Sequence, residues 1–261
     1  MQRLSVTASY LALALLAALC GFPFCWTLFA ALGSSQHPGQ LSLDNFSDVF
    51  RVIPLAAFYL NSLWIVVATV FWKLVVCALA AYPLARYQFR GARLVLAVIL
   101  ATLVLPSEVN FLVNFITVAR LGLIDTYSGV VLPNIVTALS ILLLKQAFEE
   151  IPQDLLDAAR IDGASEWTLL TRILLPLIAP WLAAVGTLAA VEAWNDYIWP
   201  SIVMSKPSRF PVAVGVHYLS GTFGSSRRVV AAGTVLTVLP MLCLFWMTQR
   251  FFMRGMEGAV K

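Results

Sequence analysis

Six long apolar runs set the strongest limit on what this chain can fold into. The runs lie at residues 8–31, 62–85, 94–119, 127–147, 175–200 and 230–252. A helix needs roughly 20 mostly apolar residues to cross the hydrocarbon core of a bilayer, and each run meets that length. The runs are continuous rather than alternating, which favours helices over a β-barrel. We therefore predict an all-α integral membrane protein, a single transmembrane domain over residues 1–261 with six transmembrane helices.

The charge content agrees with a membrane protein and argues against other classes. Only 11% of the residues are charged, whereas a soluble domain carries about 25%. The net charge is +4, but the Lys and Arg residues are scattered, so no nucleic-acid-binding face is indicated. The four cysteines lie in apolar runs without a CxxC pair, which supports neither a zinc site nor a redox motif. The first run is longer than a signal-peptide core and opens a series of similar runs, so we interpret it as the first span.

The distribution of Lys and Arg predicts the topology. An even number of spans places both termini on one side of the membrane. Ten of the 17 Lys and Arg residues fall on that side and six on the other, and the remaining one, Lys73, lies within the second predicted span. The excess places both termini in the cytoplasm. Lys73 is expected to snorkel or to pair with another subunit rather than to bind substrate.

Four prolines and two longer polar segments interrupt the apolar pattern. Pro106, Pro133, Pro176 and Pro240 lie near or within spans and are expected to kink helices there. On the outer side, residues 33–60 contain "LSLDNFSDVF", which predicts a short interfacial helix. The other outer segment, residues 204–228, is rich in Pro, Gly and Ser and is either a disordered connector or a functional loop.

A charged segment at residues 149–174 lies between the fourth and fifth apolar runs. Six of the chain's 13 acidic residues fall between positions 149 and 172. Pro152 and Asp154 suit the first turn of a helix, Gly163 can end that helix, and Ser165 can cap the next one. The first helix carries a narrow apolar stripe of Leu155, Leu156 and Ala159. The pattern predicts a helix–turn–helix on the cytoplasmic face. Its acidic residues favour a protein partner over an anionic lipid surface.

This segment closely resembles the EAA loop of ABC-transporter permease subunits. The pattern E-A-A, three residues, G, then about nine residues and I-x-L-P is matched by "DAARIDGASEWTLLTRILLP". The matching positions are Asp157, Ala158, Ala159, Gly163, Ile173, Leu175 and Pro176. Asp157 departs from the usual Glu by one methylene. Asp162 and Gly163 form the hinge between the two helices.

Other stretches resemble the maltose-type, carbohydrate-importing branch of these permeases. They are "YLNSLWI", "AAYPLARYQFRGAR", "LGLIDTYSGVVLP" and the tail "RGMEGAVK". The resemblance implies a bacterial inner-membrane permease that pairs with a second permease subunit, two cytoplasmic ATPase subunits and an extracytoplasmic substrate-binding protein. It also implies that the EAA loop docks in a groove of an ATPase, and that residues 204–228 reach toward the binding protein. Gly163→Asp is then expected to uncouple transport.

Two helical faces carry polar residues inside predicted spans. Polar groups are costly in a membrane, so their positions are informative. The face in the third span comprises Ser107, Asn110, Asn114 and Thr117, and the face in the fifth span comprises Glu192, Asn195, Asp196 and Trp199. Both are candidate linings of a translocation pathway for a sugar. The alternative is that these side chains only bond helices together.

Two other functional classes fit the sequence less well than a permease. A membrane-embedded enzyme has little support, because the chain has two histidines and neither an HExxH nor a GxSxG motif. A secondary transporter would be expected to show paired repeats, which the sequence lacks. No Gly-Lys dipeptide occurs, so a P-loop is impossible and ATP hydrolysis must come from separate chains. We predict no catalytic residue, no metal site and no cofactor.

Overall fold

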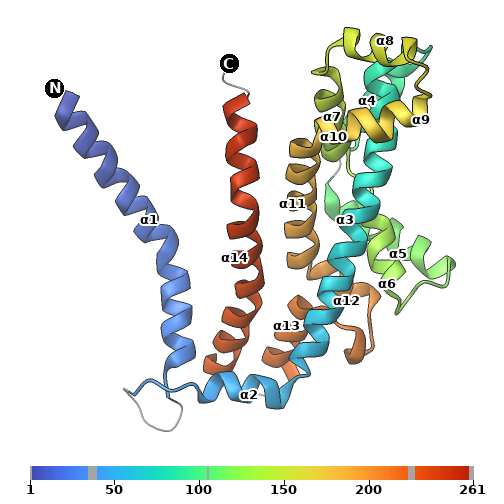
Figure 1. Ribbon diagram of the computed structural model, residues 1–261. Coiled ribbons are helices and arrows are strands. Elements are labelled where there is room, and N and C mark those ends of the chain that lie inside the picture. The colour runs from blue at the N-terminus through green and yellow to red at the C-terminus, as the bar shows by residue number, and fades with distance from the viewer. Residues whose placement is uncertain (1, 35–39, 105, 223–226, 259–261) are drawn as a thin grey trace. The chain divides into compact units, whose positions relative to one another are not determined.

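The protein folds into helices joined by short connections (Figure 1). The computed structural model describes residues 2–34, 40–104, 106–222 and 227–258, and in these ranges it contains no β-strand beyond a single bridge between Gly33 and Leu41. The helices are α1 (Gln2–Leu32), α2 (Asp44–Val52), α3 (Leu55–Arg86), α4 (Ala92–Ala101), α5 (Ser107–Arg120), α6 (Tyr127–Val131), η1 (Leu132–Asn134), α7 (Ala138–Glu149), α8 (Gln153–Ile161), α9 (Glu166–Thr168), η2 (Leu169–Leu174), α10 (Leu175–Leu177), α11 (Ala179–Asn195), α12 (Ile198–Val203), η3 (Pro207–Arg209), α13 (Val212–Thr222) and α14 (Arg227–Gly258). The predicted all-α class is confirmed.

The chain divides into two compact units. The first comprises Met1–Ala56 and Val214–Pro240, and the second comprises Ala57–Ala213 and Met241–Lys261. In the first unit, the buried Asn45 of α2 donates from Nδ2 to the carbonyl oxygens of Ala31 and Gly33, at 2.7 and 2.8 Å. These bonds satisfy carbonyl groups at the end of α1, which have no partner within that helix. The helix predicted in "LSLDNFSDVF" is thus formed as α2.

Three described helices are long and apolar enough to cross a membrane. They are Ser9–Leu32, Leu55–Arg86 and Arg227–Leu244, and the number rises to five if each of two bent helix pairs counts as one span. The bent pairs are Tyr127–Asn134 with Ala138–Glu149, at 52°, and Glu166–Leu177 with Ala179–Asn195, at 76°. The predicted runs 127–147 and 175–200 are therefore not continuous helices. The predicted run 94–119 is not continuous either, because it is divided between α4 and α5.

Prolines account for these breaks. Pro106 directly precedes α5, and the residue before a proline is disfavoured in the helical conformation. Pro133 lies in the 3₁₀ turn η1. Pro176 and Pro180 lie on either side of the 76° bend. The helix bends there because neither proline has an N–H to donate to the preceding turn. Pro240 lies inside α14, which continues to Gly258, so that proline does not end its helix.

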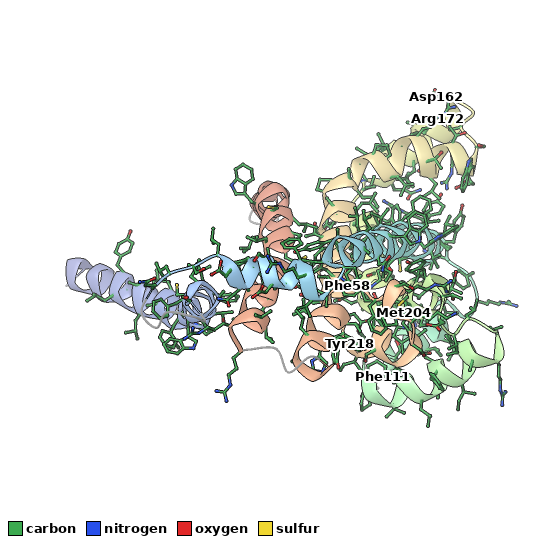
Figure 2. The ribbon with its side chains drawn as sticks, turned by 90° about the horizontal axis from the view of Figure 1, so that it is seen from below. Phe58, Phe111, Asp162, Arg172, Met204 and Tyr218 are labelled. Carbon is green, nitrogen blue, oxygen red and sulfur yellow. The ribbon has the colours of Figure 1, made fainter. Side chains whose placement is uncertain are left out.

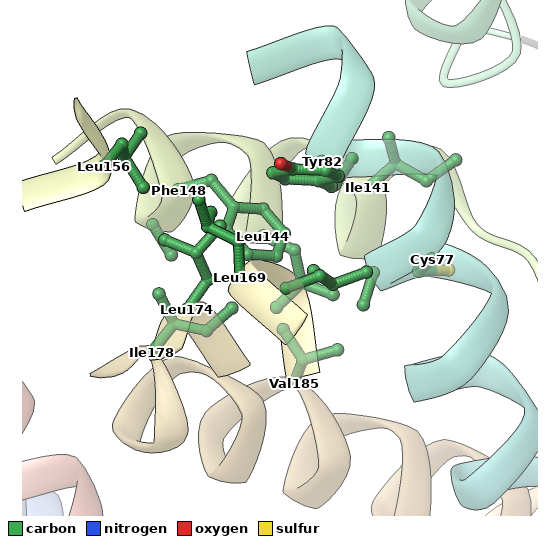
Figure 3. Packing of buried hydrophobic residues seen from close by; sticks show 14 residues of the cluster. Cys77, Tyr82, Ile141, Leu144, Phe148, Leu156, Leu169, Leu174, Ile178 and Val185 are labelled. Carbon is green, nitrogen blue, oxygen red and sulfur yellow. The ribbon is translucent and has the colours of Figure 1, made fainter. Parts of the chain in front are cut away.

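The second unit has its core where α3, α7, α8, η2 and α11 meet (Figure 3). Side chains from the Arg86 end of α3 and from α7 pack against side chains of η2 and α11. Leu156 inserts into this core from α8 and is only 1% exposed. The apolar core thus holds α8 by one deeply buried side chain and leaves most of that helix uncovered.

Candidate functional site

A tight turn joins α8 to α9 and creates a hairpin, which we call the α8–α9 hairpin. Gly163 has φ 85°, the left-handed conformation that glycine adopts most readily. The Ala164 N–H donates to Ala159 O and the Gly163 N–H to Arg160 O, both at 3.0 Å. This is a Schellman motif, which satisfies the last carbonyl groups of α8. The Ser165 hydroxyl then accepts from the Thr168 N–H at 3.2 Å, so the predicted turn and cap are both formed.

The predicted coupling residues lie mostly on the uncovered side of this hairpin. Asp157, Ala158, Asp162 and Gly163 are exposed, whereas Ala159 packs partly against the core. Figure 2 labels Asp162 on the hairpin and Arg172 on η2. Two apolar side chains are exposed beside the acidic ones, with Ile161 at 86% and Trp167 at 66%. A mixed apolar and acidic surface of this kind suits a protein partner. Farther along, Ile173 is half-buried and Pro176 exposed.

The carboxylate of Glu166 ties the hairpin to the Arg86 end of α3. Its Oε2 accepts from the hydroxyls of Tyr82, at 2.5 Å, and Tyr87, at 2.6 Å. Its Oε1 accepts from Nε and Nη2 of Arg160, both at 3.1 Å. This interaction raises the pKa of Arg160 above its usual range. This cluster could not be predicted from the sequence. Its one signal was a pair of tyrosines in "AAYPLARYQFRGAR", at the end of a span.

The side chain of Asp157 interacts within its own helix. Its Oδ1 accepts from Gln153 Nε2 at 3.0 Å and from Arg160 Nη1 at 3.4 Å. Residues three and four positions apart face each other on a helix, and the short Asp side chain is long enough to reach both partners. Asp157 is therefore connected through Arg160 to Glu166.

A cleft of about 350 Å³ lies between α3, α5 and α11. It is lined by Thr69, Lys73, Phe111, Asn134, Ala189, Glu192, Ala193, Asn195 and Asp196. Three of the four candidate residues of the predicted fifth span thus line one cleft. It offers hydroxyl, amide, ammonium and carboxylate groups beside an aromatic ring, a combination that can bind a polyhydroxylated solute.

A salt bridge joins α3 to α11 in the wall of this cleft. Lys73 Nζ lies 3.0 Å from Glu192 Oε2. The Lys73 side chain is 3% exposed and that of Glu192 is 59% exposed, so the carboxylate faces the cleft while the ammonium lies behind it. The expectation that Lys73 snorkels or pairs with another subunit was wrong, because its partner belongs to the same chain.

Trp199 does not share the cleft with the other three candidates. Helix α11 ends at Asn195, and Trp199 lies on α12, where it is buried and donates from Nε1 to Gly129 O at 3.2 Å. Its ring stacks with that of Phe111 at a centroid distance of 6.3 Å. The carboxylate of Asp196 accepts from the Trp199 N–H at 3.2 Å. Trp199 therefore supports the ring of Phe111 from behind rather than lining the cleft.

The candidate face of the third predicted span is divided in the same way. Asn110 lines a separate cleft of about 420 Å³, together with Thr102 and Thr137. Asn114 is half-buried, and the Thr117 hydroxyl donates to Val113 O of its own helix at 2.8 Å. Ser107 begins α5, but its side chain lies outside the described residues. Among the side chains that the structure describes, Asn110 therefore lines a different cleft from Glu192, Asn195 and Asp196.

Comparison with known proteins identifies the family. Residues 24–254 match the family described as the binding-protein-dependent transport system inner membrane component. The chain belongs to this family. It is 34% identical over 226 residues to the arabinooligosaccharides transport system permease protein AraQ of Halalkalibacterium halodurans, covering 86% of this chain and 81% of AraQ. It is 30% identical over 267 residues to the lactose transport system permease protein LacG of Rhizobium radiobacter, covering 100% and 98%.

Solved structures share the permease fold. A bacterial ABC transporter involved in the import of the acidic polysaccharide alginate matches with a TM-score of 0.86 at 22% identity, covering 96% of this chain and 97% of that chain. A bacterial alginate ABC transporter in complex with an alginate pentasaccharide-bound periplasmic protein matches with a TM-score of 0.74 at 16% identity, covering 97% and 96%. Membership of this family and the similarity to AraQ and LacG make the protein an inner-membrane permease subunit rather than an enzyme.

At the Leu55 end of α3, two of the permease-like motifs fold together around residues 204–212. Asn61 of "YLNSLWI" donates from Nδ2 to Ser208 O and Phe210 O, both at 3.0 Å, and accepts from the Tyr127 hydroxyl at 2.7 Å. The hydroxyl of Ser62 accepts from the Val212 N–H at 2.8 Å. Residues 204–222 also contain η3 and α13. The disordered-connector interpretation is therefore wrong for these residues, and 223–226 lie outside the described ranges.

Asp125 of the motif "LGLIDTYSGVVLP" organises the same loop of the permease. It has φ 62°, and its Oδ1 accepts from the N–H groups of Ser205 and Lys206 at 2.8 and 3.1 Å. These two backbone bonds lower the pKa of Asp125 from its usual range. The guanidinium of Arg209 donates to the Asp125 carbonyl oxygen. The resemblance had marked this motif, but only the structure shows that it anchors the loop.

Proposed function

We propose that this permease forms one half of a transmembrane pathway for an oligosaccharide or related sugar and is driven by separate ATPase subunits that dock on the α8–α9 hairpin. The observation that carries the proposal is the continuity between that hairpin and the cleft. The chain runs from Glu166 through η2 and α10 into α11, which holds Glu192 and Asn195 and is followed directly by Asp196. Movement of the hairpin can therefore reach the cleft through the backbone.

The chemistry of the cleft supports a sugar as the transported solute. Sugars present many hydroxyl groups, which both donate and accept hydrogen bonds, and apolar ring faces that pack on aromatic side chains. Asn134, Asn195 and Thr69 supply neutral hydrogen-bonding groups, and Phe111 supplies the ring. The names of AraQ and LacG describe transport of arabino-oligosaccharides and lactose, which have this chemistry.

The proposed assembly contains a second permease subunit, two cytoplasmic ATPases and an extracytoplasmic binding protein. Six spans remain our proposal, with the three broken runs each crossing the membrane as a kinked helix. Both termini and the α8–α9 hairpin would then face the cytoplasm, and the loop held by Asn61 and Asp125 would face the binding protein. The excess of Lys and Arg on the first side supports this orientation.

Reconstitution tests the function directly. The full complex would be purified with its ATPase and binding-protein subunits and placed in liposomes, and uptake of lactose and of an arabinotriose would be measured with and without ATP. ATP-dependent uptake of either sugar is expected. Uptake that needs no ATP, or that is driven by an ion gradient, would contradict the proposal. Ion-gradient-driven uptake would instead support a secondary transporter.

The orientation has its own test. Single cysteines at exposed positions 154 on the hairpin and 206 in the loop, introduced into a cysteine-free chain, would be labelled in intact spheroplasts with a membrane-impermeant maleimide. Labelling of position 206 alone is expected. Labelling of position 154 alone would reverse the topology.

A further inference from the structure

The Glu166 cluster joins two parts of the chain that are distant in sequence. Tyr82 and Glu166 are 84 residues apart, yet the tyrosine hydroxyl lies 2.5 Å from the carboxylate. Arg160 binds the other oxygen of the same carboxylate from α8. Because one partner is ionised, these hydrogen bonds are shorter and stronger than bonds between neutral groups. One side chain therefore connects both helices of the hairpin to α3.

The receiving end on α3 is firmly held. Tyr82 is 7% exposed, and its ring meets the ring of Phe148 edge-on at a centroid distance of 5.7 Å. One turn farther on, the Arg86 guanidinium donates to the carbonyl oxygens of Phe148 and Ile151, the latter at 2.7 Å. A displacement of Glu166 would therefore be passed to a fixed end of α3 rather than taken up by a mobile side chain.

The hairpin is linked to the cleft by two routes of different stiffness. The route along the backbone passes through the π-helix η2 and a 76° bend before it reaches α11. The route along α3 is an unbroken helix from Lys73 to Tyr82. Nine residues of helix separate those two side chains, or roughly 13 Å. The two routes end on opposite partners of the Lys73–Glu192 salt bridge.

We propose that Glu166 is a positioning residue that makes α3 move together with the α8–α9 hairpin, so that the ATPase subunits displace both walls of the cleft. This rests on the proposed function, since it assigns a route to the ATPase-driven movement. Without the Glu166 contacts the hairpin would still pull on α11, but α3 would follow it less closely, because only the apolar core would then join the two. ATP binding would then change the cleft less.

The test measures how strongly the nucleotide state changes access to the cleft, without needing to know the sugar. Ala193→Cys supplies a thiol in the cleft of a chain whose four native cysteines are replaced. Its labelling rate by a water-soluble maleimide would be measured in the full complex in liposomes, free of nucleotide and trapped with ATP and vanadate. Losing a hydrogen bond to a charged group shifts an equilibrium by about tenfold. The ratio of the two rates should fall by up to that factor in Glu166→Gln.

Two further variants sharpen the comparison. Tyr87→Phe removes one hydroxyl at a 40% exposed position, so it should fold normally and reduce the ratio partially. Asp154→Asn removes an exposed carboxylate of the same hairpin and should leave the ratio unchanged. In Tyr87→Phe, which changes a residue outside the docking hairpin, co-purification of the ATPase subunits and their basal ATPase rate should match the wild type.

The outcomes separate this inference from the proposed function. If the wild-type ratio responds to nucleotide and both Glu166→Gln and Tyr87→Phe keep that ratio, Glu166 does not transmit the movement, and the inference fails while the function stands. An equal loss in Asp154→Asn would also overturn it, since any loss of charge on the hairpin would then suffice. No response in the wild type itself would overturn the proposed ATP-driven function.

Discussion

Replacing Glu192 with Gln is expected to destabilise the permease more than replacing Lys73 with Met, although both changes break the same salt bridge. The reason is the difference in burial. The Lys73 side chain is 3% exposed, whereas that of Glu192 is 59% exposed. Glu192→Gln leaves an ammonium group buried without its counter-charge. Lys73→Met leaves a carboxylate at an open surface, where it can be hydrated.

The size of the difference follows from the geometry. Two unit charges 3.0 Å apart attract by about 5.5 kcal/mol at an effective dielectric constant of 20 and by about 1.4 kcal/mol in water. The half-open site lies between these limits. Removing one partner of a buried pair costs about 3–5 kcal/mol, which we expect for Glu192→Gln. Replacing a buried charge with an apolar side chain of similar volume is often nearly neutral, and the carboxylate that remains can be hydrated, so we expect a loss of about 1 kcal/mol or less for Lys73→Met. The double variant should be about 2 kcal/mol more stable than Glu192→Gln alone.

The difference in stability between the two variants is measured by heating the purified complex and monitoring the fraction of permease that remains intact. The order of stability should be wild type, Lys73→Met, the double variant and then Glu192→Gln, with the middle two close together. Glu149→Gln is a matched control, because it breaks the Lys145–Glu149 pair, in which the lysine side chain is 16% exposed. That control should cost about 1 kcal/mol or less. A larger loss for Lys73→Met than for Glu192→Gln would refute the assignment of Lys73 as the buried partner.

Three further predictions concern the hairpin and the loop at the other end of α3. At φ 85° a residue with a side chain carries about 1–2 kcal/mol of backbone strain, and Asp tolerates this conformation at least as well as Ala. A new Cβ at Gly163 meets nothing within 4 Å. Any further loss in the Asp variant must then come from its larger, charged side chain at the surface where the ATPase docks. Uptake should therefore be well below that of the Ala variant, while the ATPase subunits still co-purify. Normal uptake in the Asp variant would contradict docking at this turn. Leu156→Ala should cost about 2–5 kcal/mol and expose the hairpin to proteolysis, and an unchanged cleavage pattern would contradict its anchoring role. Asp125→Asn should preserve the loop better than Asp125→Ala in limited proteolysis, since Asn keeps an oxygen acceptor and tolerates φ 62°. Because the pKa of Asp125 is lowered, its stabilising effect is present at neutral pH and should be lost only as the pH falls below about 4, so earlier loop cleavage on acidification would count against it.

The hairpin could be predicted from the sequence because its determinants are local. A glycine in the left-handed conformation and a serine cap act within four residues, so Gly163 and Ser165 could be assigned from the order of residues alone. The same holds for Leu156, whose burial followed from the apolar stripe of α8. Leu155, on the same predicted stripe, is 43% exposed, because the residues of this short helix that reach the core are Leu156 and, in part, Ala159.

The contacts that hold the sites together could not be predicted, because they join distant parts of the chain. Lys73 and Glu192 are 119 residues apart, and Asn61 and Phe210 are 149 apart. Hydrophobic periodicity shows which face of a helix is buried, but it does not show which other helix covers that face. The motifs containing Asn61 and Asp125 were noticed by resemblance, and their shared role at one loop became visible only when the chain was folded.

The candidate face of the fifth predicted span shows where helical spacing fails as an argument. Steps of three and four residues place side chains on one face only while the helix continues. Glu192 and Asn195 lie on α11, but that helix ends at Asn195, and Trp199 belongs to α12. The break has a chemical cause in the same stretch, because the Asp196 carboxylate accepts the Trp199 N–H and caps the start of the next helix. The side chains of Asn and Asp compete with the helical backbone for its hydrogen bonds. Asn195 and Asp196, which suggested a polar face, are therefore also the residues at which the helix ends. The break turns Trp199 behind Phe111 and leaves Glu192, Asn195 and Asp196 around one cleft. The end of α11 at Asn195 therefore decides which of the four candidate residues line the cleft.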